Sequence, residues 1–247
     1  MKILTLNCQR AHHKESLIEF LSYVIESNEY DAVFLQELPQ DILPIVNDDN
    51  EYHYVSDRTI TGPNGRVAVI LRKDYEILKT DHCLFERQKT EDKEYFFELI
   101  SVLFRDKDLK KYIFSSLHMP AYLHIYRRIR HLKKVFWRIG ELKKENNEDA
   151  VVVVGGDWNS IFPYEKYILS YSLSNHFKFE FPKQPTVFAG RIEPGLFWNN
   201  FVKKTSSLVK LDFIVDFFLL SSNVKCNIQV IESDVSDHNP VSLTIGD

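Results

Sequence analysis

Side chains that can bind metal ions or transfer protons recur in this sequence at the ends of apolar runs. Strand ends are rigid, so polar groups that converge there are held in a fixed arrangement. If these groups meet, they form the kind of carboxylate, amide and imidazole cluster that phosphoryl chemistry requires. The residues are Asn7 after Ile-Leu-Thr-Leu, Glu37 after Val-Phe-Leu-Gln, His118 after Phe-Ser-Ser-Leu, Asp157 and Asn159 after a run of valines, and Asp237 with His238 before Pro-Val-Ser-Leu.

The apolar runs beside these residues have the patterns of strands. Val151 to Val154 are four consecutive valines without a polar face, which predicts a strand covered on both sides. Two segments, Leu17 to Ile25 and Ile125 to Ile139, instead carry apolar residues at helical spacing. Because strands outnumber helices, we expect helices outside the sheets of a mixed α and β protein. Further strands are predicted at 3–7, 31–37, 66–72, 95–104, 112–118, 211–221, 227–232 and 240–245.

Length and composition predict a single domain over residues 1–247. The chain is 44% hydrophobic, which is enough for one large core. No linker rich in Pro, Gly or Ser divides it, and no segment repeats at a fixed period. The most apolar segment, Leu211 to Leu220, is too short for a membrane span. The sequence enters a strand-like run at Met1 without a leader pattern, and three dispersed cysteines suit a reducing compartment, so we expect a cytoplasmic protein.

The formal net charge of −4 argues against a surface coated with positive charge for indiscriminate nucleic-acid binding. Any basic surface must therefore be local. The helical segment from Ile125 is the main candidate, and a solvated helix face is the alternative interpretation of the same charges. The basic residues are Arg127, Arg128, Arg130, Lys133 and Lys134, followed by Lys203, Lys204 and Lys210.

Six short motifs resemble those of the endonuclease/exonuclease/phosphatase family and occur in the family's order. They run from residue 3 to residue 241, so the resemblance covers nearly the whole chain. Each motif alone is weak, since Asp-x-Asn or Ser-Asp-His is common, but six in order are a specific signal. The resemblance implies a deoxyribonuclease I-like α/β (α+β) fold, a four-layer sandwich of two mixed β-sheets with helices on the outer faces. The motifs are LTLNCQ, DAVFLQEL, SSLHMP, GGDWNS, DFFLLS and SDHNPV.

The resemblance also implies a divalent-metal-dependent phosphoesterase. Glu37 would be the main ligand of Mg²⁺, or of Mn²⁺, with Asn7 beside it. Asp237 would help to fix the metal shell or the adjacent imidazole. Considered alone, Glu37 is better explained as a solvated strand end, and Asn7 as a turn-forming amide.

The same resemblance assigns proton transfer and phosphate binding to the later motifs. His238 would act as general base or as a charge-stabilising group, oriented by a carboxylate. Asp212 and Asp216 both lie in the predicted strand 211–221, four residues apart and so roughly 13 Å from each other on one face, which leaves room for only one at the site. We select Asp216, because Phe-Phe-Leu-Leu-Ser follows it, although Asp212 gives a competing register.

Three residues complete the implied catalytic set. Asp157 would align the attacking water, Asn159 would hold the phosphate or that water, and His118 would donate to a phosphate oxygen as negative charge develops. A buried core histidine is the alternative for His118. A strand-to-loop turn is the alternative for Asp157 and Asn159.

Four residues are weaker candidates for substrate binding. Arg10 and Arg66 lie near strands that carry motifs, and Arg127 begins the basic helix. Trp198, or Phe197 beside it, could stack on a base if exposed, whereas burial in the core is the alternative. At Asn7 the chain continues Cys8-Gln9-Arg10 rather than with the glycine usual in abasic-site nucleases, which argues against that specificity.

Three functions fit these residues. The first is hydrolysis of nucleic-acid phosphodiesters by an endonuclease, exonuclease or end-processing enzyme. The second is hydrolysis of a lipid headgroup, an inositol phosphate or another small phosphorylated substrate. The third is a non-catalytic binding protein on the same fold. We expect a monomer in each case.

Overall fold

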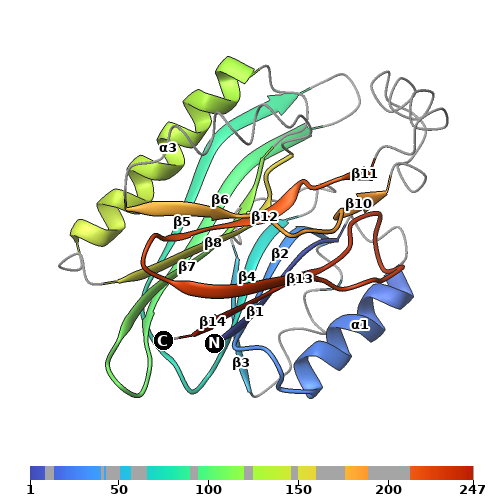
Figure 1. Cartoon of the computed structure of the whole chain (residues 1–247), viewed down its shortest axis with the longest axis horizontal. Coiled ribbons are helices and arrows are strands. Elements are labelled where there is room, and N and C mark those ends of the chain that lie inside the picture. The colour runs from blue at the N-terminus through green and yellow to red at the C-terminus, as the bar shows by residue number, and fades with distance from the viewer. Residues whose placement is uncertain are drawn as a thin grey trace.

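The computed structural model describes residues 1–8, 14–39, 42, 51–56, 66–89, 94–119, 125–145, 150–159, 176–188 and 212–246. These residues form two six-stranded sheets, a two-stranded ribbon and two α-helices (Figure 1). None of the described helices has an apolar stretch that could cross a membrane.

The first sheet has the strand order β13-β14-β1-β2-β4-β3. Its central pair, β1 and β2, is parallel, and every other neighbouring pair is antiparallel. Helix α1 connects the two parallel strands. The elements are β1 (Lys2–Asn7), α1 (Lys14–Glu26), β2 (Ala32–Leu38), β3 (Tyr52–Ser56), β4 (Arg66–Arg72), β13 (Lys225–Val230) and β14 (Val241–Gly246).

The second sheet has the order β5-β6-β7-β8-β12-β9 and the same pattern of directions. Its central pair, β7 and β8, is parallel and is connected by helix α3, whereas the flanking pairs are antiparallel. The elements are β5 (Glu76–Lys89), β6 (Glu94–Arg105), β7 (Lys111–His118), α3 (Ile125–Lys144), β8 (Val151–Asp157), β9 (Phe177–Glu180) and β12 (Asp216–Ser221). A separate ribbon joins β10 (Val187–Phe188) to β11 (Asp212–Phe213).

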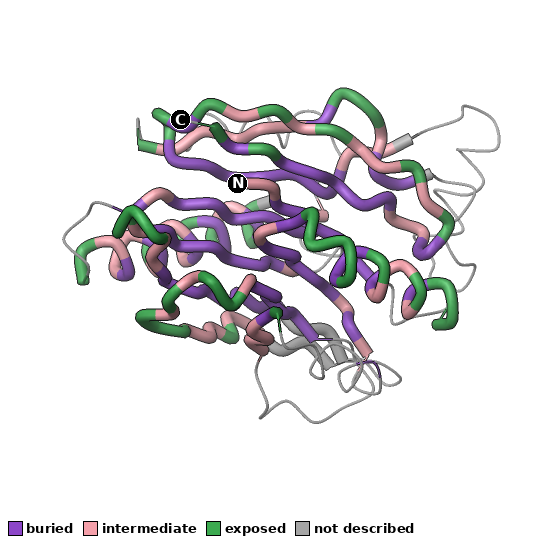
Figure 2. The backbone as a smooth tube through the Cα atoms, turned by 90° about the horizontal axis from the view of Figure 1, so that it is seen from below, coloured by how far each residue is buried: buried purple, intermediate pink, exposed green. Residues whose placement is uncertain are grey.

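Three apolar clusters show four layers. One fills the space between the sheets and includes Phe34, Phe114 and Phe218. A second packs α3, through residues such as Leu132 and Ile139, on the outer face of the second sheet. The third packs α1 on the outer face of the first sheet. Burial accordingly concentrates in the strands and on the inner sides of the helices (Figure 2). The predicted two-sheet sandwich with outer helices is confirmed.

Two sequence predictions of elements were wrong or incomplete. The predicted strand 211–221 is two strands, because the chain leaves the β10–β11 ribbon and enters the second sheet only at Asp216. Asp212 and Asp216 therefore do not share a strand face, and the 13 Å argument does not apply. Strands β3, β5, β9 and β10 were not predicted at all. The side chain of Asp212 lies outside the described residues.

Candidate functional site

The predicted polar residues lie where the two central parallel pairs end. Asn7 ends β1, Glu37 is the next-to-last residue of β2, His118 ends β7 and Asp157 ends β8. Side chains alternate along a strand, and the inter-sheet core takes Ile3 from β1, Phe114 from β7 and Val153 from β8. Asn7, His118 and Asp157 are each an even number of residues from these positions, so their side chains project between the sheets.

Two contacts join the sheets at this end. The Asn7 Nδ2 donates to Asp157 Oδ2 at 2.9 Å. His118 Nε2 lies 3.3 Å from Glu37 Oε1 and 3.9 Å from Asp157 Oδ2. The Asn7–Asp157 and Glu37–His118 contacts each pair a residue of the first sheet with one of the second. The His118–Asp157 contact lies within the second sheet, so the four residues form one cluster.

Glu37 reaches this cluster because β2 is irregular. The pairing of β2 with β4 shifts register between Leu35 and Leu38, and Glu37 has a φ of 51°. Such a bulge re-aims side chains at a strand end. A positive φ is uncommon for a residue with a long side chain and costs about 1–3 kcal/mol when the surrounding structure imposes it.

Asp157 is fixed by hydrogen bonds on both carboxylate oxygens. Its Oδ1 accepts from the backbone N of Asn159 at 2.8 Å, and its Oδ2 accepts from Asn159 Nδ2 at 2.7 Å as well as from Asn7. Asn159 also has a positive φ of 47°, and its Nδ2 is close to the Met119 carbonyl at 2.6 Å. Burial and the neighbouring Asp216 raise the pKa of Asp157 to about 6, against the opposing charges of His238 and His118.

His238 lies beside Asp216, with Nδ1 at 2.8 Å from Asp216 Oδ2. Asp237 Oδ1 is 3.7 Å from the other ring nitrogen of His238. Burial disfavours the charged imidazole, but Asp216, Asp237 and Asp157 outweigh burial and raise the pKa of His238 well above its usual value. The pKa of His118 is also raised, because Glu37 and Asp157 outweigh its burial.

Thr186 positions the Asp216–His238 pair and was not identified from the sequence. Its hydroxyl accepts from the backbone N of Val215 at 3.0 Å and of Asp216 at 3.2 Å. Its carbonyl accepts from the backbone N of Asn239 at 2.7 Å. One buried threonine thus ties the start of β12 to the loop that carries His238. A lone Thr beside Pro185 has no sequence signal that would have revealed this role.

Gln36 forms a polar layer directly beneath the cluster. Its Nε2 donates to Ser116 Oγ at 2.8 Å in the second sheet and to Thr5 Oγ1 at 3.2 Å in the first. Ser116 Oγ donates in turn to the Leu35 carbonyl at 3.0 Å. The side chains of Thr5, Gln36 and Ser116 are all buried. The sequence signal for this layer was Gln36 itself, a polar residue at the end of the apolar run before Glu37.

Glu98 is a second buried acid that the sequence analysis missed. It pairs in register with His118 across β6 and β7, is 2% exposed, and adds to the charges that raise the pKa of His118. Its Oε1 has no hydrogen-bond partner among the described residues. A glutamate inside the apolar run Tyr95 to Phe104 was the available signal.

The weaker candidates do not join the cluster. Arg66 begins β4 and is 5% exposed on the face toward α1, where its charge acts on Tyr54. Arg127 is exposed on α3, with Nη1 3.9 Å from Glu86 Oε1. Arg10 and Trp198 lie outside the described residues, as do Phe197, Lys203, Lys204 and Lys210. Arg128 is 4% exposed and donates to the Trp158 carbonyl at 3.1 Å and to that of Asn159, so it does not belong to a basic surface.

The donor set suits a hard divalent cation. Four carboxylates meet two imidazoles, so the cluster keeps a formal negative charge even when both rings are protonated. Asp216 Oδ1 is buried without a hydrogen-bond partner among the described residues. Ligand atoms of Asp157, Asp216 and His238 lie within 4.8 Å of one another. Asp216 and His238 are hydrogen-bonded to each other. Glu37, Asn7 and Asp237 are the oxygen donors outside that hydrogen bond.

Comparisons with known proteins support the fold. No protein-family model matches the chain, and no curated protein matches it in sequence. Solved structures do match over nearly the full length. TDP2 from D. rerio, solved with a single-strand DNA product, is 17% identical with a TM-score of 0.75, covering 100% of this chain and 99% of that one.

Two further structures give the same result. An endonuclease/exonuclease/phosphatase from Bacteroides vulgatus is 17% identical with a TM-score of 0.73, covering 99% of this chain and 98% of that one. The human Nocturnin catalytic domain, with a bound sulfate anion, is 12% identical with a TM-score of 0.70, covering 100% and 94%. The likeness confirms the fold that the motifs implied.

Proposed function

We propose that this protein is a divalent-metal-dependent phosphoesterase that hydrolyses phosphodiester bonds of nucleic acid. The observation that carries the proposal is the cross-sheet cluster, in which Asn7 contacts Asp157 and Glu37 contacts His118. The motif resemblance and the structural likeness to TDP2, which was solved with a DNA product, support the substrate class.

Glu37, Asn7 and Asp237 would hold the metal, for which we propose Mg²⁺, or Mn²⁺ in its place. Bound there, the ion would supply Lewis-acid polarisation of a phosphoryl oxygen. Carboxylate and amide oxygens are the ligands that such hard cations prefer, and they leave coordination positions for water and phosphate.

The remaining residues would orient and move protons. Asp216 holds the ring of His238 through Nδ1, which leaves Nε2 to face substrate as a proton acceptor or as a charged partner for phosphate. Asp157 would orient the attacking water through a carboxylate that is itself fixed by Asn7 and Asn159. His118, whose pKa Glu37 and Asp157 raise against the effect of burial, would donate to a phosphate oxygen as negative charge develops.

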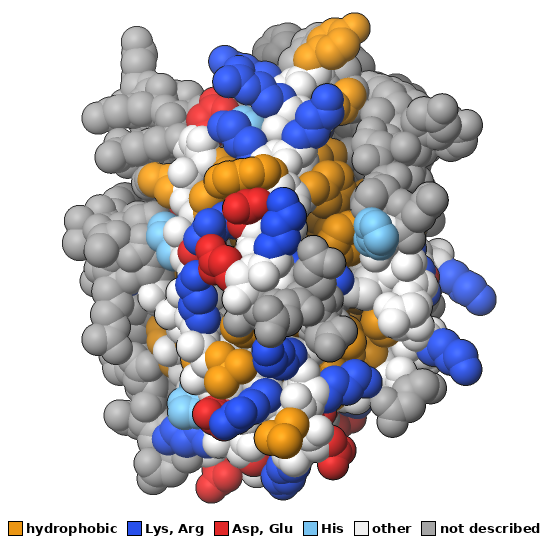
Figure 3. All heavy atoms as spheres, turned by 90° about the vertical axis from the view of Figure 1, so that its left-hand side faces the viewer, with side chains coloured by type: hydrophobic (Ala, Val, Ile, Leu, Met, Phe, Trp, Pro, Cys, Tyr) orange, Lys and Arg blue, Asp and Glu red, His pale blue; other side chains and the backbone are white. Residues whose placement is uncertain are grey.

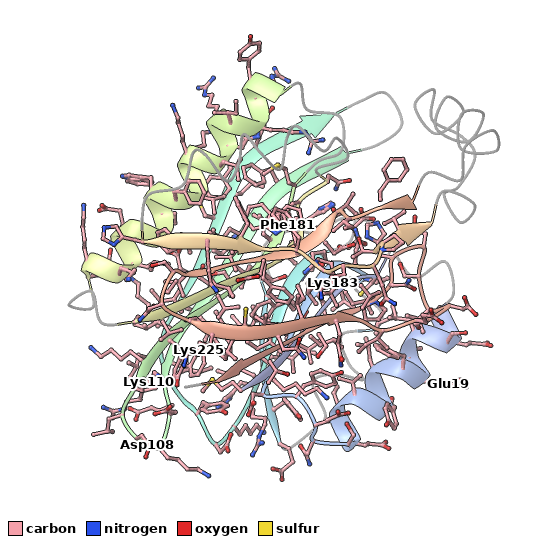
Figure 4. All side chains as sticks on the ribbon, viewed as in Figure 1. Glu19, Asp108, Lys110, Phe181, Lys183 and Lys225 are labelled. Atoms are coloured by element: carbon pink, nitrogen blue, oxygen red, sulfur yellow. The ribbon has the colours of Figure 1, made fainter. Side chains whose placement is uncertain are left out.

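The test is an activity screen of the full chain with Mg²⁺ and Mn²⁺, with a chelator as control. The panel contains single-stranded, duplex, abasic and end-blocked oligonucleotides, a generic phosphodiester and a monoester, inositol phosphates and phosphocholine lipids. We expect metal-dependent cleavage of oligonucleotides that Asp157→Ala or His238→Ala abolishes. Asp108→Asn, an exposed aspartate at the far end of the β6–β7 hairpin, is the matched control (Figure 4).

Two results would count against the proposal in different ways. Hydrolysis of lipids or small phosphate esters with oligonucleotides uncut would replace the nucleic-acid substrate but keep the phosphoesterase. No hydrolysis of any compound, together with no metal binding by calorimetry, would favour a binding protein on this fold.

A further inference from the structure

The outer face of α3 is unusually basic for this protein. Eight Lys and Arg residues and a single Glu lie in this helix, in a chain whose Lys and Arg total 31 and whose Asp and Glu total 35. Figure 3 looks onto this side of the molecule, where many basic side chains lie among apolar and a few acidic ones. The side chains on the outer side of the helix point away from the sheets (Figure 4).

Four residues form one line along that face, which we call the α3 stripe: Tyr126, Arg130, Lys133 and Trp137. Their spacing of four, three and four residues places them on one side of a helix. Tyr126 is 76% exposed and Trp137 is 62% exposed, whereas most large apolar side chains of the described residues are buried. Aromatic rings beside a line of cations can stack on planar groups while the cations bind anions.

The stripe borders a hollow of about 430 Å³. Its lining residues are Tyr126, Ile129, Arg130, Lys133, Lys134 and Trp137. The hollow therefore offers ring faces and aliphatic stems together with ammonium and guanidinium groups.

The two cations in the middle of the stripe are available to an anion. Arg138 binds Asp81, with Nε at 2.7 Å from Oδ2, and Arg127 lies 3.9 Å from Glu86. Arg130 and Lys133, in contrast, have no acidic partner among the described residues. Asp81 and Glu86 of β5 thus pair with Arg138 and Arg127 beside the stripe, whereas Arg130 and Lys133 within it can meet an external negative charge.

We propose that the α3 stripe binds single-stranded nucleic acid, with bases stacked on Tyr126 and Trp137 and the intervening phosphates on Arg130 and Lys133. Stacking on an exposed ring requires an unpaired base, which excludes an intact duplex. At ~1.5 Å per residue the rings stand roughly 16 Å apart along the helix. A stacked strand rises ~3.4 Å per nucleotide, so the stripe matches about five nucleotides.

An anionic membrane is the less suitable partner. A helix that lies in a membrane interface inserts an apolar face, but the apolar face of α3, including Leu132, Val135 and Ile139, is buried against the second sheet. The exposed rings of Tyr126 and Trp137 are separated by charged side chains instead of forming a continuous apolar patch.

The stripe begins close to the candidate site. Helix α3 starts shortly after His118, and Arg128 in its first turn donates to the Trp158 and Asn159 carbonyls. A strand bound along the stripe would therefore run toward the end of β8. The inference that the strand leads to a catalytic site rests on the proposed phosphoesterase function. Binding of the strand to the α3 stripe does not depend on that function.

The test measures fluorescence anisotropy of a labelled oligothymidylate in the presence of a chelator, so that no hydrolysis occurs. The double variant Arg130→Gln/Lys133→Gln should reduce the slope of log affinity against log salt by about 1.4, since each phosphate contact on a single strand contributes about 0.7. Trp137→Ala should weaken binding about tenfold and leave that slope unchanged. Affinity should fall for oligomers shorter than about five nucleotides.

Matched controls come from surfaces elsewhere. Tyr23→Ala removes an exposed ring from α1, and Lys107→Gln/Lys225→Gln removes two exposed cations away from α3. Neither should change affinity or slope. The stripe variants should still hydrolyse a small phosphodiester at the wild-type rate, and Asp157→Asn should still bind the oligomer. If the wild type binds the oligomer but hydrolyses no substrate, the proposal for the α3 stripe would stand and only the proposed phosphoesterase function would be rejected.

Three outcomes would overturn the proposal. One is equal affinity and equal slope in the wild type and the double variant. Another is duplex binding that depends on Trp137 as strongly as single-strand binding does. The third is association with phosphatidylcholine–phosphatidylserine vesicles, lost in the double variant, while the oligomer does not bind.

Discussion

The two halves of this protein repeat one plan with different side chains. In each sheet a parallel pair, β1 with β2 and β7 with β8, is connected by an outer helix and flanked on both sides by antiparallel strands. Because the carboxyl ends of both parallel pairs lie at the same end of the sandwich, each half delivers two polar residues to one place. The scaffold is shared, so chemical differences between the halves come from the residues at four strand ends.

The residues at these strand ends differ in chemical type between the two halves. The first half supplies Asn7 and Glu37, a neutral amide and a partly exposed carboxylate, which are suited to holding a metal. The second half supplies His118 and the buried Asp157, which are suited to proton transfer and to orienting water. Each half places one non-glycine residue with a positive φ at this site, Glu37 or Asn159. Under the proposed function, the strand ends of the first half would hold the cation, and those of the second half would handle the phosphate together with His238, which precedes β14.

The outer helices of the two halves differ in charge. Helix α1 carries one Lys and three Glu, including exposed Glu19 (Figure 4), whereas α3 is strongly basic. Of the two outer helices, α3, in the half proposed to handle phosphate, is the one with a basic surface that would attract a polyanion.

The largest expected effect separates the two halves by metal rescue. Asp157→Asn should lower kcat/KM by about 10²–10⁴-fold at every metal concentration, because it removes the group that orients water. Glu37→Gln should cause a loss of about 10²-fold or more at low Mg²⁺ that shrinks as Mg²⁺ is raised, because a weakened ligand set still binds when the ion is abundant. The measurement is kcat/KM against Mg²⁺ concentration for both variants. Identical metal dependence of the two variants would contradict the division between halves.

The next effect concerns the contact between β7 and β8. Gly156 has a φ of +149°, and a Cβ there would lie 2.0 Å from the Leu117 carbonyl oxygen in the neighbouring strand. Gly156→Ala should therefore destabilise the protein by about 3 kcal/mol or more, since both backbone strain and overpacking act. Urea denaturation measures this loss. A change below ~1 kcal/mol would show that the central pair of the second sheet yields easily, and that the second half is less rigid than its packing implies.

How far the sequence predicted the molecule depended on how regular each element is. Strands with unbroken apolar runs were located most closely: β4 was predicted at 66–72 and is Arg66–Arg72, whereas β8 continues three residues beyond the last valine, to Asp157. Strand β5 was missed because its pairing shifts twice, between Ile77 and Lys79 and between Leu84 and Glu86, so its side-chain alternation is broken. The break at residues 214–215 was missed because Leu211 to Leu220 reads as one apolar run, although the two parts pair in different sheets.

The site shows the same limit. The order of the motifs predicted that Asn7, Glu37, His118, Asp157 and His238 lie together, and the structure brings them together. Thr186 could not be found in this way, because its role depends on backbone groups from β12 and from the loop after β13 that meet only in three dimensions. Local pattern therefore reveals residues that carry chemistry, whereas residues that hold them in place emerge from tertiary structure.

A smaller effect is expected where the halves meet beneath the site. Gln36→Met preserves side-chain length but leaves Ser116 without its amide donor, and should cost about 1–3 kcal/mol. Combined with Ser116→Ala, it should show a coupling energy of roughly 0.5 kcal/mol or more by urea denaturation. Ser101→Ala is the control, because the Ser101–Ser115 contact of 2.7 Å lies within one sheet and should add independently to Gln36→Met. Additive losses for Gln36 and Ser116 would mean that this polar layer does not join the two halves energetically.

The smallest expected effect distinguishes the two outer helices. Helix α3 contains Gly140 in its interior and α1 contains no glycine. A Cβ at Gly140 would meet nothing within 4 Å, so Gly140→Ala should stabilise the protein by about 0.5–1 kcal/mol through lower backbone entropy of the unfolded chain. Thermal and urea denaturation measure the gain, and oligomer binding to the α3 stripe should remain unchanged. Destabilisation by Gly140→Ala would mean that α3 needs its glycine for a contact made outside the described residues, a constraint that α1 lacks.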